Sequence, residues 1–210
     1  MGQEEVINLR KTYRKDCFKE LNKQIIIIGL IFTLSVIVGT YLNKMWPNYQ
    51  NNIIDNINPS IQYYNDSSIG LKDTTVTNLK SDTIFMANIA VLSMLVITFP
   101  LAIGVVILKG ISIGYTINSI ILTLKFKSVK MILITFMKNI LIVPGAIILV
   151  IISYNYFKET IYELKKGKKD NILFLLRRYI VNAVIVIAMT VGLQLLLNTV
   201  SVSIIKFLVR

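Results

Sequence analysis

Long apolar runs alternate along the chain with shorter polar stretches that hold most of the charged residues. A run at 24–42 contains no charged side chain and follows a tail at 1–23 that is rich in lysine and arginine. About 20 apolar residues suffice for one helix to cross the hydrocarbon core of a membrane. The pattern therefore predicts a basic cytoplasmic N-terminal tail and then a first transmembrane helix. A cleaved signal peptide is the alternative, but the long polar tail and the lack of a small-residue cleavage site favour a retained anchor.

The largest polar region, 43–82, separates this run from the rest of the chain. Its acidic residues slightly outnumber its basic ones, as is typical of an external loop. Ile53, Ile54, Ile57 and Ile61 recur at helical spacing and predict a short amphipathic helix on the outer surface. Two interpretations of the loop stay open, a partner-contact site and a plain spacer.

Residues 83–210 predict a membrane helix bundle, whose first span is expected at 83–108. Pro100 predicts a kink in this span, because proline removes a backbone donor and clashes one turn back. Lys109 follows; a lysine at the membrane midplane costs about 2.5 to 3.5 kcal/mol, so we place it at a tight cytoplasmic corner. The next run, 111–124, is short for a full crossing, so either its flanking lysines extend to the interfaces or it is re-entrant.

The last two spans are expected at 129–153 and 179–206, joined by a basic cytoplasmic connection at 154–178. The first of them is interrupted by Lys138-Asn139 and by Pro144-Gly145. The predicted fold class is an all-α polytopic membrane helix bundle with about five transmembrane helices, one of them short or re-entrant. Placing most basic residues inside puts the N-terminus in the cytoplasm and the C-terminus outside. A re-entrant 111–124 would return the C-terminus to the cytoplasm.

Composition agrees with this class and limits the chemistry. Of 210 residues, 54% are hydrophobic and 16% are charged, whereas about a quarter are charged in soluble domains. The net charge of +12 comes from basic residues between apolar runs, which favours lipid headgroups over nucleic acid as the partner. The chain has no histidine and one cysteine, Cys17, and every acidic residue falls in a predicted loop or tail. We therefore expect no catalytic, cofactor-binding or metal-binding residues and no enzyme activity.

Small and amide residues within the spans favour association between helices. Ser35 and Gly39 lie four apart, where a neighbouring helix can approach closely, and Gly110 and Gly114 form a second step of this kind. Two interpretations of Lys138 stay open: a side chain that reaches the membrane surface and a functional polar site.

The stretch 107–144 combines these features in an order that resembles a known family. Its characteristic residues are Lys109, Gly110, Gly114, Tyr115, Thr116, Lys138, Asn139, Ile140 and Pro144. They resemble the core pattern of the stage II sporulation protein M family, a Lys-Gly-x-x-x-Gly-aromatic-Thr segment followed by a Pro-x-Asn-Leu run that ends in a second proline. The chain departs from this pattern at Met137, where the first proline would fall, and at Lys138, where a neutral amide is expected.

This resemblance implies a membrane protein of endospore-forming bacteria that acts in the mother cell during engulfment of the forespore. The family is similar in role to a scaffold that localises and holds the cell-wall hydrolases called stage II sporulation proteins P and D. The peptidoglycan chemistry would then belong to these partners, and self-association stays open. The alternative is a transport subunit for a small, anionic solute, in which broken segments around Lys109, Lys138 and Pro144 line a path.

Overall fold

The computed structural model describes residues 3–45, 71–124, 128–166 and 170–209. All the secondary structure in these residues is helical, and four stretches of it are long and apolar enough to cross a membrane. These stretches are Glu20–Leu42, Val96–Leu122, Thr135–Lys165 and Asn171–Leu197. The predicted all-α membrane bundle is confirmed.

The first helix, α1 (Gln3–Met45), continues the predicted span in both directions. Many of its apolar side chains are exposed, among them Ile26, Leu30 and Leu34. An exposed apolar face of this length is expected where a helix is bathed in lipid. The helix therefore packs on the bundle along one face and exposes the opposite, apolar face.

The predicted single span at 83–108 is wrong, because the chain breaks and reverses within it. Helix α3 (Leu71–Met94) ends before a short 3-10 helix, η1 (Val96–Thr98), and α4 (Phe99–Leu124) then runs back along α3. Leu95 has an extended backbone, and its carbonyl accepts hydrogen bonds from the backbone and hydroxyl of Thr98. Pro100 lies in the first turn of α4, where its missing N–H costs little. The proline thus begins a helix instead of kinking one.

Three further expectations change with this hairpin. Residues 71–82, predicted as loop, form the first half of α3, whereas the predicted amphipathic helix at 53–61 lies outside the described residues. Lys109 is not a cytoplasmic corner but lies in the middle of α4. The segment 111–124 is neither a separate crossing nor re-entrant; it is the second half of α4.

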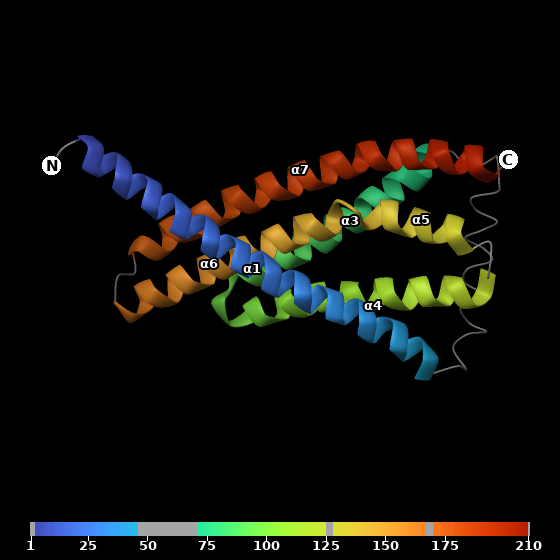
Figure 1. Ribbon diagram of the computed structural model, residues 1–210, viewed down its shortest axis with the longest axis horizontal. Coiled ribbons are helices and arrows are strands. Elements are labelled where there is room, and N and C mark those ends of the chain that lie inside the picture. The colour runs from blue at the N-terminus through green and yellow to red at the C-terminus, as the bar shows by residue number, and fades with distance from the viewer. Residues whose placement is uncertain (1–2, 46–70, 125–127, 167–169, 210) are drawn as a thin grey trace.

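The second half of the chain forms α5 (Ser128–Asn139), α6 (Ile142–Lys165) and α7 (Asp170–Val209). The basic stretch 154–178 is mostly helical, since α6 continues to Lys165 and α7 begins at Asp170. In Figure 1, α6 ends and α7 begins at the end of the molecule where α1 begins, which we call the α6–α7 end. At the opposite end, the α4–α5 end, α4 and α7 finish and α3 and α5 begin.

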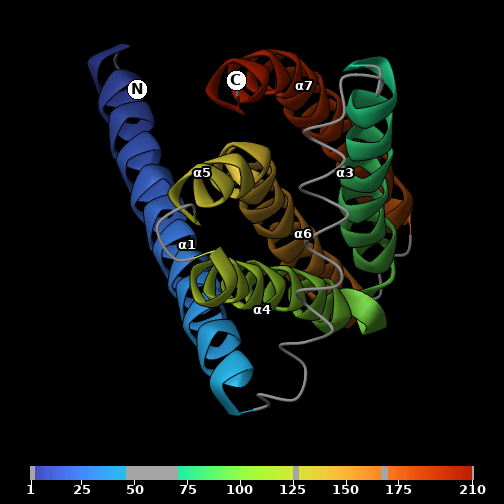
Figure 2. The same cartoon turned by 90° about the vertical axis from the view of Figure 1, so that its right-hand side faces the viewer.

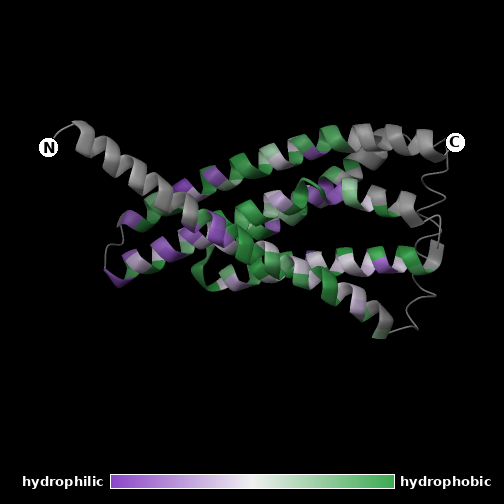
Figure 3. Cartoon of the chain, in the orientation of Figure 1, coloured by the Kyte–Doolittle hydropathy of each residue, from purple (hydrophilic) through white to green (hydrophobic). Residues whose placement is uncertain are grey.

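The helices pack around an apolar core that includes Met86, Ile89, Ala102, Leu149 and Val150. Figure 2 views the bundle along its length, with α1 on one side, α3 and α7 on the other and α4, α5 and α6 between them. Hydrophilic residues gather near the α6–α7 end, and hydrophobic ones dominate further along the helices (Figure 3). This gradient is the one that a membrane boundary near the α6–α7 end requires.

Candidate functional site

The central feature of the bundle is a close crossing of α1 and α4 made by glycines. A Cβ added at Gly114 would overlap the backbone of Val36, and one added at Gly39 would overlap the backbone of Ile111. At Gly110 the nearest atom to such a Cβ is the Cβ of Ser35, at 2.8 Å. The small residues at these positions thus allow a close approach, which joins two helices of the same chain.

Polar atoms extend the crossing toward the α4–α5 end. The Asn118 side-chain amide donates a hydrogen bond of 3.0 Å to the Thr40 carbonyl. Thr116 donates its hydroxyl hydrogen to the Ser112 carbonyl within α4, and Tyr115 is half-buried. Of the residues from the first segment of the resemblance, Gly110 and Gly114 therefore set the distance between the helices.

A charged cluster lies beside this crossing. Asp82 of α3 is only 2% exposed, and its Oδ2 atom has no hydrogen-bond partner among the described residues. Lys109 of α4 and Lys138 of α5 bring positive charge near this carboxylate. The Lys109 ammonium also lies 5.0 Å from the ring centre of Phe85, one turn along α3 from Asp82.

The position of Asp82 corrects the expectation that every acidic residue lies in a loop or tail. At a rise of 1.5 Å per residue, Asp82 is about 20 Å along α3 from the turn at Leu95. Lys109, whose positive charge acts on Asp82, lies near the middle of the Val96–Leu122 span. The local sequence did not indicate a buried carboxylate, because Asp82 follows a polar stretch that resembles a loop.

The second segment of the resemblance forms the break between α5 and α6. Asn139 is the last residue of α5 and donates a hydrogen bond of 2.8 Å to the Thr135 carbonyl. Pro144 lies in the first turn of α6, where a missing N–H is tolerated. The break frees carbonyls of α5, and the buried side-chain amide of Gln194 on α7 donates to one of them, Met137, at 3.2 Å.

Both segments of the resemblance therefore meet at one place. Lys109 from the first and Lys138 from the second act on the same carboxylate, while Gly110 and Gly114 fix α4 against α1. Sequence reasoning selected these residues but missed Asp82 and the role of Gln194.

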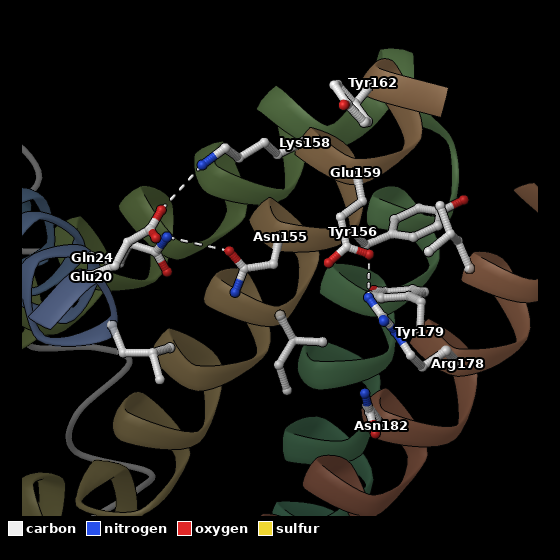
Figure 4. A pocket seen from close by; sticks show the side chains of 13 residues that line it. Glu20, Gln24, Asn155, Tyr156, Lys158, Glu159, Tyr162, Arg178, Tyr179 and Asn182 are labelled. Atoms are coloured by element: carbon white, nitrogen blue, oxygen red, sulfur yellow. Dashed lines mark hydrogen bonds and ion pairs between the residues drawn. The ribbon is translucent and has the colours of Figure 1, made fainter. Parts of the chain in front are cut away.

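A second feature, not predicted from the sequence, lies at the α6–α7 end. A cavity of about 700 Å³ opens between α1, α6 and α7, and we call it the α1–α6–α7 pocket. Figure 4 shows two charged pairs at its rim, Lys158 with Glu20 at 3.1 Å and Arg178 with Glu159. Between α1 and α6, the Gln24 side chain donates a hydrogen bond of 3.3 Å to the Asn155 side chain (Figure 4).

Two stacked tyrosines support the floor of this pocket. The Tyr156 and Tyr179 ring centres are 4.8 Å apart. Their hydroxyls donate hydrogen bonds to α3, Tyr156 to the Met94 carbonyl at 3.2 Å and Tyr179 to the Ala90 carbonyl at 2.9 Å. Because Met94 ends α3, the Tyr156 bond satisfies a carbonyl that the helix leaves free. The pocket is thus built on a fixed base.

Within 3–45, 71–124, 128–166 and 170–209, no group of three or more His, Cys, Asp or Glu side chains is arranged to hold a metal ion. The polar groups that these ranges bring together are ammonium and guanidinium groups, single carboxylates, amides and hydroxyls. Such groups are suited to holding helices or charged ligands in place. No family model matches the chain, and neither a curated protein nor a solved structure matches it significantly.

Proposed function

We propose that this chain is a non-catalytic membrane scaffold of the sporulation engulfment machinery. In this role it localises peptidoglycan hydrolases, stage II sporulation proteins P and D, and holds them at the septal and engulfing membrane of the mother cell. The partners supply the chemistry. Membrane lipids surround the bundle, with the N-terminus in the cytoplasm and the C-terminus outside.

The observation that carries this proposal is the convergence of the two resembling segments on Asp82. Lys109 and Lys138 lie on different helices, about 30 positions apart in sequence, yet both act on one buried carboxylate. Ionisable residues within a membrane bundle are costly and usually serve a purpose, here the fixing of α3, α4 and α5 relative to one another. A rigid bundle with long exposed apolar faces on α1 and α7 is suited to holding neighbouring membrane segments.

Co-purification from sporulating cells tests the scaffold. The tagged full-length chain should retain the hydrolase partners, and a photo-crosslinking residue at Leu34 of α1 or Ile185 of α7 should capture one of them. Both positions are exposed, whereas the same residue at Val150, which is buried, serves as the internal control. Failure of the hydrolases to co-purify, together with no cross-link from either face, would contradict the proposal.

A second candidate function is transport of a small anionic solute, and the charged cluster favours it. Two lysines and one carboxylate within the bundle carry a net positive charge, which suits an anion. The sequence argument against transport was the lack of an acid within the spans. Asp82 weakens that argument, because it is buried in the bundle beside the four candidate spans, although it lies in none of them. Flux of an anion into liposomes that contain only this protein, lost in Asp82→Asn, would favour transport over the scaffold.

A further inference from the structure

The α1–α6–α7 pocket lies where three helices pass from polar to apolar sequence. On α1, Lys23 is the last charged residue before the uncharged run, and the pocket is lined by Glu20, Leu21 and Gln24 just beside it. On α6 and α7, Lys158 and Arg178 mark the same level. This is the depth at which phospholipid headgroups meet acyl chains.

The lining changes in character across the pocket. The four charged side chains are about half-exposed and form the rim, whereas the lining residues Leu175 and Tyr156 are buried and form the floor. α1 and α7 each pack on α6 and leave the pocket between them. Exposed apolar residues of both helices, such as Ile25 and Phe174, continue along the lipid-facing surface. A ligand with a charged head and an apolar tail would match this lining.

The charged side chains at the rim of the pocket determine which lipid headgroup can bind there. Two carboxylates and two basic groups are present, so the rim is neutral overall and offers both signs. The side chains of Lys158 and Glu20 are 63% and 59% exposed, so their ion pair contributes little and is easily opened. A headgroup that carries both a phosphate and an ammonium can therefore contact a basic side chain and a carboxylate at once.

We propose that the α1–α6–α7 pocket binds a zwitterionic phospholipid whose headgroup combines a phosphate with a primary ammonium, as in phosphatidylethanolamine. Arg178 and Lys158 hold the phosphate, and Glu159 and Glu20 accept hydrogen bonds from the ammonium. A trimethylated ammonium has no N–H to donate, so phosphatidylcholine binds more weakly. An anionic lipid without an amine leaves both carboxylates unmatched, so phosphatidylglycerol also binds more weakly.

Native mass spectrometry of the delipidated full-length protein tests this site. The protein is mixed with equal amounts of phosphatidylethanolamine, phosphatidylglycerol and phosphatidylcholine, and the expected result is a preferred adduct with one phosphatidylethanolamine. Arg178→Gln should weaken this binding about tenfold, as is usual for the loss of one charge-assisted hydrogen bond. Arg177→Gln is the matched control, because Arg177 is next to Arg178 in the sequence but its side chain is exposed and does not line the pocket.

A second variant guards against misfolding. Lys158→Gln removes an exposed charge and should weaken phosphatidylethanolamine binding while the melting temperature stays unchanged. Lys165→Gln is its control, because Lys165 is exposed on the same helix and does not line the pocket. Equal retention of the three lipids, or a preference that survives both pocket variants, would overturn the proposal. Binding of free phosphoethanolamine as tight as that of the lipid would show a soluble ligand and overturn it too.

Discussion

At the scale of single residues, two glycines of α4 differ in what surrounds them. A methyl group at Gly114 would overlap the backbone of Val36 on α1, whereas one at Gly104 would meet no atom within 4 Å. Both residues belong to the same apolar helix, and both would gain helix propensity from alanine. The difference between them therefore isolates the close crossing of α1 and α4.

The first prediction concerns this pair. Gly114→Ala should lower the free energy of unfolding by about 1 to 3 kcal/mol, because a backbone must shift to admit the methyl group. Gly104→Ala should leave it unchanged or raise it by up to about 1 kcal/mol. Unfolding in mixed detergent micelles measures both. Equal effects of the two substitutions would mean that α1 does not pack closely on α4.

The second prediction concerns Asp82. Asp82→Asn keeps the shape but leaves Lys109 and Lys138 without their buried counter-charge, so the free energy of unfolding should fall by about 1 to 3 kcal/mol. Lys109→Met in the same chain should restore part of the loss. Glu163→Gln, at the end of α6, is the control and should change little. An Asp82→Asn variant as stable as the parent protein would show that the carboxylate does not balance the lysines.

At the scale of the elements, the break between α5 and α6 shows what local sequence can predict. Pro144 and the polar pair before it mark an interruption near 138–145, and the structure ends α5 at Asn139 and begins α6 at Ile142. A proline in the first turn of a helix is a local signal that does not depend on the rest of the fold. The interruption was therefore predicted, although the partner that stabilises it was not.

The reversal at Leu95 shows where local sequence is insufficient. The apolar run at 83–108 is continuous, so its pattern predicts one span, yet α3 packs on α4, α6 and α7 and the chain turns back. The polar first half of α3 favours loop by its Asp, Thr and Asn residues but is helical. Long-range packing decides both outcomes, and it also places Asp82 opposite Lys109. Gly110 and Gly114 were found in advance because close helix contact needs small residues whichever helix is the neighbour.

The third prediction tests the hydrogen bond from Gln194 of α7 to the Met137 carbonyl, which lies in α5 next to the break between α5 and α6. Gln194→Leu removes the donor to the Met137 carbonyl and leaves that acceptor in a buried site, so the free energy of unfolding should fall by about 1 to 3 kcal/mol. Leu193→Ala alters the adjacent exposed side chain and should change it by less than about 0.5 kcal/mol. If Gln194→Leu unfolds like the parent protein, the α5 carbonyls must find another partner.

At the scale of the whole molecule, the helices are longer than a membrane requires. Helix α7 has 40 residues, about 60 Å at 1.5 Å per residue, against a hydrocarbon core about 30 Å thick. It is apolar over Asn171–Leu197 and stays largely apolar to Val209, so a helix of this length must tilt in the membrane or extend past the hydrocarbon core. Helix α1 extends beyond its span at the α6–α7 end, where its sequence is polar.

The fourth prediction follows from this arrangement and from the charges. Basic residues are frequent in the first half of α1 and around the α6–α7 end, which favours that end as the cytoplasmic one. Because α7 leads from that end to the opposite one, a reporter that is active only outside the cytoplasm should be active when fused after Arg210. The same reporter inserted between α6 and α7 should be inactive, which controls for expression and export. Activity at the α6–α7 insertion and none at Arg210 would invert the orientation, and it would also place the α1–α6–α7 pocket in the outer leaflet.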